Sequence, residues 1–150
     1  MRVYLVVIDE SEEALTALHF AARRAAKTDG TVHLLAVVAP QPFNAFAGVQ
    51  ATIEEEARSR AEALATSAAG SLLSESGRMP VISVIQGEAE KVVRDYLAEH
   101  PEVSALVLGA AKDGGPGPLV QHFTGHLSHL HCPLFVIPGA LSAEDIERVS

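Results

Sequence analysis

Residues 3–22 read VYLVVIDESEEALTALHFAA, and this stretch predicts a strand that is followed at once by a helix. The first six residues are uninterrupted Val, Tyr, Leu and Ile, as expected for a strand that helices cover on both faces. From residue 11 to residue 27, small and apolar side chains recur at helical spacing and form one stripe: Ala14, Leu15, Leu18, Ala21, Ala22 and Ala25. Gly30 then ends the helix in a turn.

Short apolar runs and helical segments alternate through the rest of the chain. Apolar runs occupy residues 3–8, 32–38, 81–85, 105–108 and 134–137. Further helices are expected at residues 52–74, where Thr52 and Glu55 have capping-box spacing, and at residues 88–98. A fourth helix at residues 119–130 turns Leu119, Val120, Phe123, Leu127 and Leu130 inward, and Ser142 with Asp145 indicates one short capped helix near the end.

This alternation predicts one α/β domain over residues 1–150, with a parallel sheet wound on both faces. In such sheets, ligands bind outside the carboxyl ends of the strands, where the strand order reverses. Residues 39–51 contain two prolines and Gly48, and they are expected to form a mobile loop at that same edge.

The composition argues against several classes of partner. Nineteen acidic and eleven basic side chains give a net charge of −8, which repels nucleic acid and anionic membrane surfaces. A single cysteine, Cys132, excludes an intrachain disulfide. No signal-peptide pattern opens the sequence, and no apolar run approaches the roughly 20 residues that span a bilayer. We therefore expect a soluble, cytoplasmic protein.

Asp9 is the first candidate for a binding residue. It follows the first strand at the ligand edge, where a carboxylate can accept hydrogen bonds from ribose hydroxyls. The alternative is that Asp9 only supports the cap that Ser11 provides to the next helix.

The loop and helix at residues 108–126, LGAAKDGGPGPLVQHFTGH, are the second candidate. Glycines let a backbone approach a phosphate closely, and the start of a helix supplies N–H donors. Lys112 adds a cation. Pro116 and Pro118 donate no N–H, however, and loops of glycine and proline are often plain turns.

His122, His126 and His129 have helical i, i+4, i+7 spacing, so two of them could share a metal ion. No carboxylate lies close in sequence to complete the ligand set, and the alternative is a solvated surface. Neither Ser11 nor Thr124 has the sequence context of a nucleophile elbow, and Cys132 before Pro133 is typical of a buried strand entry. Nothing here requires an enzyme.

Several motifs in order resemble the universal stress protein family. The resemblance rests on VVIDESEEALTALHFAARRA, HLLAVVAP, VIQGEAEKVV, ALVLGA and CPLFVIPG, and these motifs span nearly the whole chain. It implies a five-stranded parallel sheet of order 3-2-1-4-5. It also implies a homodimer through the last strand, from Leu134 to Ile137, which is otherwise an open hydrophobic edge.

The resemblance further implies an adenine-nucleotide cleft for ATP or a related nucleotide. Adenine would lie near Val37 and Val38, ribose near Asp9, and phosphates along a loop containing Lys112 and four glycines: Gly109, Gly115, Gly117 and Gly125. ATP-binding members share the pattern Gly, two residues, Gly, nine residues, Gly, then Ser or Thr. If Gly109 is taken as the first glycine of the pattern, Lys112 stands where the second glycine should be. If Gly115 is taken as the second glycine, Gly125 is correctly placed as the third, but His126 stands where Ser or Thr should follow. Half of the pattern is present, and a nucleotide with fewer phosphates or another small anion is the alternative to ATP.

Three functions are compatible with these residues. The first is a stress-response dimer with an altered nucleotide cleft. The second is a protein-interaction module that binds no nucleotide and uses residues 39–51 or the C-terminal segment. The third is a slow ATPase that uses Lys112 and a histidine.

Overall fold

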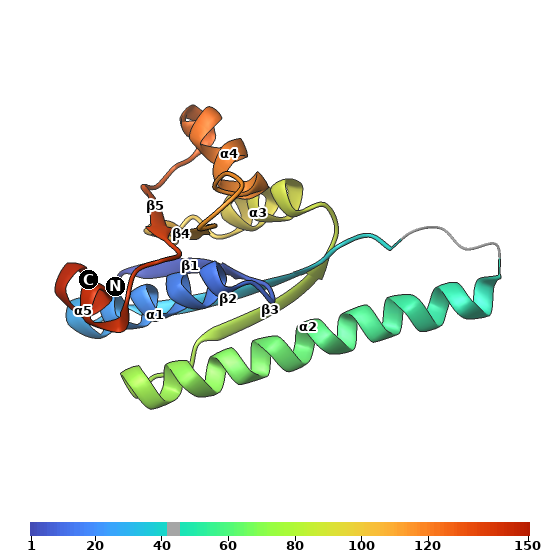
Figure 1. Cartoon of the computed structure of the whole chain (residues 1–150), viewed down its shortest axis with the longest axis horizontal. Coiled ribbons are helices and arrows are strands. Elements are labelled where there is room, and N and C mark those ends of the chain that lie inside the picture. The colour runs from blue at the N-terminus through green and yellow to red at the C-terminus, as the bar shows by residue number, and fades with distance from the viewer. Residues whose placement is uncertain (42–45) are drawn as a thin grey trace.

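The computed structural model describes residues 1–41 and 46–150, and Figure 1 shows one sheet with helices packed on both faces. The strands are β1 (Val3–Ile8), β2 (Thr31–Val38), β3 (Val81–Gln86), β4 (Ala105–Ala110) and β5 (Leu134–Pro138). The helices are α1 (Glu12–Thr28), α2 (Ala47–Ser76), α3 (Ala89–Glu99), α4 (Pro118–Gly125) and α5 (Ala143–Val149), with a 3-10 turn at Leu127–His129.

The sheet has the order β3-β2-β1-β4-β5, and every pairing between neighbouring strands is parallel. The predicted order 3-2-1-4-5 is therefore confirmed. All six residues of the central strand β1 are buried, as its uninterrupted apolar sequence predicted.

Alternate side chains of β1 enter two separate cores. One core, under α1, α2 and α5, contains Tyr4, Val6 and Ile8; the other, under α3 and α4, contains Val3, Leu5 and Val7. The central strand β1 thus contributes side chains to the packing on both faces of the sheet.

The edge strand β3 differs from the prediction that helices cover both of its faces. Val81, Ile82 and Ile85 remain 48%, 40% and 36% exposed. The reason is its position, because β3 is an edge strand with one pairing neighbour, β2, among the described strands. The apolar run showed that it was a strand but not where it lies in the sheet.

Three helix details also differ from the sequence predictions. Helix α2 already begins at Ala47, so the Thr52 capping box is wrong; the Thr52 hydroxyl donates to the Gly48 carbonyl oxygen within the helix, at 3.0 Å. Of the loop predicted at residues 39–51, residues 42–45 lie outside the described residues, and residues 47–51 belong to α2, so the loop prediction is wrong there. Helix α4 ends at Gly125, which leaves Leu127 54% exposed, and Leu15 at the edge of the α1 stripe is 56% exposed. Both leucines had been predicted to face inward.

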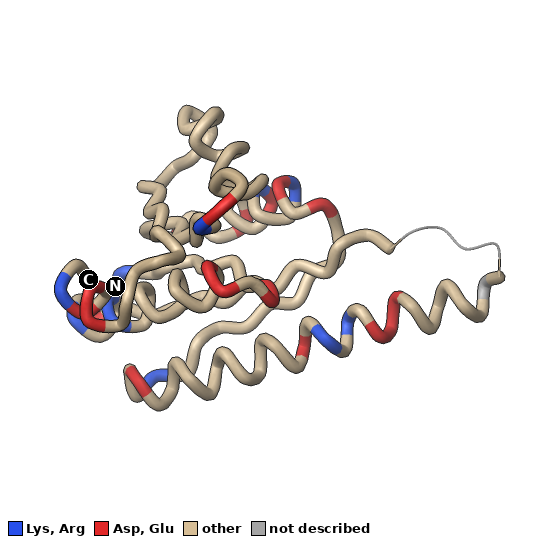
Figure 2. The backbone as a smooth tube through the Cα atoms, in the orientation of Figure 1, with Lys and Arg blue, Asp and Glu red and all other residues tan. Residues whose placement is uncertain are grey.

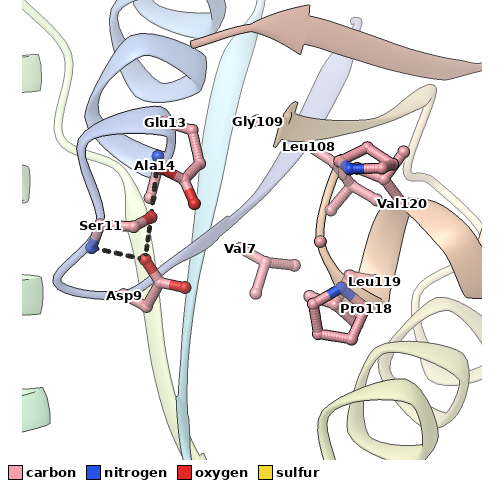
Figure 3. Close-up of a pocket in the computed structure, with 12 residues that line it drawn as sticks. Val7, Asp9, Ser11, Glu13, Ala14, Leu108, Gly109, Pro118, Leu119 and Val120 are labelled. Atoms are coloured by element: carbon pink, nitrogen blue, oxygen red, sulfur yellow. Dashed lines mark hydrogen bonds between the residues drawn. The ribbon is translucent and has the colours of Figure 1, made fainter. Parts of the chain in front are cut away.

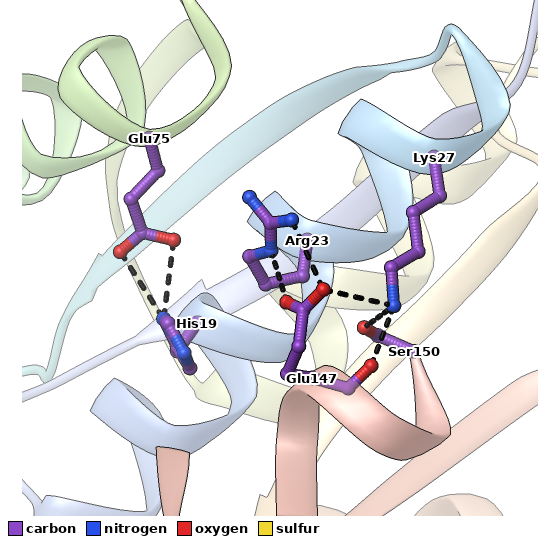
Figure 4. Close-up of polar contacts among 6 residues, drawn as sticks. All are labelled: His19, Arg23, Lys27, Glu75, Glu147 and Ser150. Carbon is purple, nitrogen blue, oxygen red and sulfur yellow. Dashed lines mark hydrogen bonds and ion pairs between the residues drawn. The ribbon is translucent and has the colours of Figure 1, made fainter. Parts of the chain in front are cut away.

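The C-terminal helix α5 is held on α1 by polar contacts as well as by the buried side chain of Ile146 (Figure 4). Arg23 Nε donates to a Glu147 carboxylate oxygen at 2.6 Å, and Lys27 Nζ donates to the Ser150 hydroxyl at 3.1 Å. The hydrogen bond from Arg23 lowers the pKa of the Glu147 carboxyl group. Ser142 and Asp145 form the capping box that the sequence predicted for this helix.

His33 on β2 lies in an aromatic cluster beneath α3. The side chain is 7% exposed, and its Nδ1 shares a hydrogen bond with the Tyr96 hydroxyl at 2.8 Å. The His100 ring stacks on Tyr96, with 3.9 Å between ring centroids. Burial, and then the neighbouring His100, lower the pKa of His33 below 6.5, so the neutral imidazole is the form that the fold prefers.

We expect this cluster to make the folded state less stable in mild acid. The unfolded chain protonates His33 near pH 6.5, whereas the folded chain does so only at lower pH. The free energy of unfolding should therefore fall as the pH drops below about 6.5 and level off below the folded-state pKa. Urea titrations between pH 7.5 and pH 5 would measure it. His33→Gln should show a shallower fall, and an equal fall in both proteins would contradict this role for His33.

Candidate functional site

The carboxyl ends of β1, β2 and β4 meet at one edge of the sheet, because these strands are parallel neighbours. After β1 the chain enters α1 on one face, whereas after β4 it enters α4 on the other face. The strand order reverses between β1 and β4, which is where such sheets bind ligands. Asp9, directly after β1, stands at this point.

Two cavities open at this edge. The first, of about 90 Å³, lies between β1 and α4 and is shown in Figure 3; Val7, Leu108, Gly109 and residues 116–120 form much of its wall. The second, of about 450 Å³, lies between the end of β2 and helix α2, with Val37 and Val38 in its wall. Asp9 and Ser11 line both cavities, so the two spaces meet at the start of α1.

Asp9 both supports the helix cap and faces the cleft. Its Oδ1 accepts hydrogen bonds from the Ser11 hydroxyl and, at 2.8 Å, from the Ser11 main-chain N–H. The Ser11 hydroxyl oxygen in turn accepts from the Ala14 N–H at 3.2 Å. In Figure 3 the second carboxylate oxygen of Asp9 faces the space across from α4. The two sequence interpretations of Asp9 are thus compatible.

The four candidate glycines have different positions. Gly109 lines the first cavity, and a Cβ atom there would overlap the main-chain carbonyl of Glu13, so close packing of α1 on β4 requires this glycine. Gly117 lines the same cavity and precedes α4 with φ of 100°. Gly115, with φ of 91°, and Gly125, the last residue of α4, line neither cavity.

Charge in the cleft is mostly negative. Glu13 lines the first cavity and Glu10 the second, in addition to Asp9. Lys112 lines neither, and its Nζ lies 3.1 Å from a carboxylate oxygen of Glu12. Among the described residues, Arg60 of α2 is the one Lys or Arg that lines either cavity. Sequence analysis missed Arg60, because no local pattern marks it.

The histidines lie on α4 and the turn that follows it. The rings of His122 and His126 stack with 4.5 Å between centroids, and His126 Nδ1 donates to the His122 carbonyl oxygen at 2.7 Å. Within residues 1–41 and 46–150, no group of three or more His, Cys, Asp or Glu side chains is arranged to hold a metal ion. Burial raises the pKa of the Cys132 thiol, which disfavours the nucleophilic thiolate.

These features define a small doubly wound α/β protein with a cleft at the reversal of strand order. The chain belongs to the universal stress protein family, whose model matches residues 1–138. No curated protein matches the sequence closely enough to count as a relative.

Solved structures share the fold. UspA from Lactobacillus plantarum is 21% identical with a TM-score of 0.79, and the match covers 91% of this chain and 97% of that one. A family member from Arabidopsis thaliana with AMP bound is 14% identical with a TM-score of 0.63, covering 92% of each chain. A universal stress protein in complex with cAMP is 12% identical with a TM-score of 0.60, covering 91% of this chain and 96% of that one.

One further observation concerns membranes. None of the helices in the described part of the chain combines the length and apolarity needed to cross a bilayer.

Proposed function

We propose that this chain is a cytoplasmic stress-response protein that binds an adenine nucleotide carrying few phosphates, such as AMP. The observation that carries this proposal is the position of Asp9, which lines both cavities. Adenine would pack on Val37 and Val38, and the free Asp9 oxygen would accept hydrogen bonds from the ribose hydroxyls. The related folds with AMP and with cAMP support a nucleotide of this size.

The altered phosphate loop disfavours a triphosphate. Pro116 and Pro118 line the first cavity and donate no N–H. Glu13 contributes a carboxylate to the same wall, and Lys112 is already paired with Glu12. A long polyphosphate there would meet like charge with few donors to compensate for lost hydration.

Asp9→Asn tests the ribose contact. The amide oxygen can still accept from Ser11, whereas the charge is lost, so we expect roughly tenfold weaker binding of both AMP and adenosine. Isothermal titration calorimetry would measure both affinities, with Asp113→Asn as control because exposed Asp113 lines neither cavity. Unchanged affinity in Asp9→Asn, or much tighter binding of ATP than of AMP, would contradict the proposal.

Dimerisation through β5 is part of the same proposal. As the last strand in the order, β5 has one pairing neighbour in the described chain, and Val136 on it is 36% exposed. Pairing the segment from Leu134 to Ile137 with a second copy would satisfy its free hydrogen-bonding groups. Sedimentation of the purified chain measures this directly, and a monomer at high micromolar concentration would contradict it.

A further inference from the structure

Arg60 is an unpaired cation in an acidic protein. Within the described part of the chain it has no ion pair or hydrogen bond, whereas Arg58 on the same helix lies 3.3 Å from Glu62. Glu62 lies one turn beyond Arg58 and Glu56 lies one turn before Arg60, and among the described residues the structure forms an ion pair at the first of these spacings but not at the second. Arg60 is thus available to a bound anion.

The surroundings of Arg60 suit one end of an amphipathic molecule. It belongs to the second cavity, whose wall includes Ile8, Val37, Val38, Ala61 and Leu64 together with the carboxylates of Asp9 and Glu10. In Figure 2 the two arginines of α2 lie on the long helix, across from the acidic start of α1. The second cavity therefore offers an apolar wall, the Asp9 carboxylate as an acceptor for hydrogen bonds from ligand hydroxyl groups, and the guanidinium group of Arg60.

Size separates the two cavities. Pockets that hold small molecules are typically about 300–1,000 Å³. The second cavity, at about 450 Å³, falls in this range, whereas the first, at about 90 Å³, does not. Of these two cavities, the second is therefore the one with room for most of a nucleoside monophosphate.

Resting on the function proposed above, we propose that Arg60 recognises the phosphate group of the nucleotide. The phosphate lies toward α2, instead of over the loop between Gly109 and Gly117. A guanidinium group can donate two parallel hydrogen bonds to phosphate oxygens, and it keeps its charge at any physiological pH. On the α4 side, the phosphate would face Glu13 without a cation. Arg60 is thus the residue that favours AMP over adenosine.

The test compares AMP and adenosine as probes, by isothermal titration calorimetry at low salt. In the wild-type protein, AMP should bind more tightly than adenosine. Arg60→Gln should weaken AMP binding roughly tenfold to a hundredfold and leave adenosine unchanged, because only AMP carries the phosphate. Arg58→Gln, a change of the same chemistry on the same helix, should alter neither affinity. The advantage of AMP should also shrink with added salt in the wild-type protein.

Three other outcomes of these titrations would overturn the inference, and each of them can be told apart from the others. An unchanged ratio of AMP to adenosine affinity in Arg60→Gln would place the phosphate elsewhere, for example at the start of α4, while nucleotide binding itself stands. Equal losses for both probes would show that Arg60 packs on the base or the sugar. If neither probe binds to the wild-type protein, the proposed function fails together with the inference. Circular dichroism would confirm that these exposed substitutions leave the fold intact.

Discussion

The Gly109→Ala variant is expected to unfold several degrees below the wild-type protein. A Cβ atom at this position would overlap the main-chain carbonyl of Glu13, well inside the 3.0 Å that real Cβ atoms keep. The obstacle is backbone on the first turn of α1, so no side chain can rotate away and the helix must shift. Forced overpacking of this kind costs about 3 kcal/mol. For a chain of this size, that loss corresponds to roughly 6–12 °C in Tm.

Gly125→Ala is the matched control. A Cβ atom there meets nothing within 4 Å, and the residue ends α4 without a left-handed φ. Alanine should leave the stability unchanged or raise it by about 0.5 kcal/mol, because it restricts the unfolded chain. Differential scanning calorimetry of both variants would measure the contrast. Equal Tm values for the two alanine variants would show that the α1–β4 contact tolerates a methyl group.

Phe123→Ala is expected to cost about 3–5 kcal/mol of unfolding free energy. Phe123 is 1% exposed and joins α4 to the core that contains Leu106 and Leu108 of β4. Helix α4 has eight residues, of which Val120 and Phe123 are buried, so little else can hold it in place. Truncation leaves a cavity that such a short helix can close only by moving.

The effect of Phe123→Ala should extend to the cleft, because Leu119 and Val120 at the start of α4 line the first cavity. Urea denaturation would measure the stability. Leu127→Ala is the control, since Leu127 lies just beyond α4 and is 54% exposed; its expected cost is within about 0.5 kcal/mol. A small loss in Phe123→Ala, comparable to that of the control, would mean that α4 is anchored by other contacts.

Local patterns were sufficient for most of the fold. Uninterrupted apolar runs identified the strands, and the stripe on α1 identified a helix of nearly the observed length, because both periodicities are properties of neighbouring residues. The helix boundaries were predicted less accurately than the helices themselves. Thr52 and Glu55 have capping-box spacing inside a helix that begins earlier, at Ala47. A spacing motif does not exclude further helical turns before it.

The same reasoning predicted part of the candidate site correctly and part of it wrongly. Asp9 was identified because a residue that follows a central parallel strand must lie at the ligand edge. Lys112 was expected to serve a bound anion, but its partner in the structure is Glu12, which is 100 residues away in the sequence. Gly109 was attributed to the approach of a phosphate, whereas the structure shows that it admits the first turn of α1.

The sequence by itself determined the order of strands and helices, the parallel sheet and the place of Asp9, because these depend on residues that are neighbours in the chain. Only the tertiary structure decided which side chains from distant segments share the cleft. It placed Arg60 of α2 in the same cavity as Asp9, joined Lys112 to Glu12, and left the apolar side chains of β3 at an exposed edge. Such contacts depend on how the helices pack across the sheet, and local periodicity carries no information about that packing.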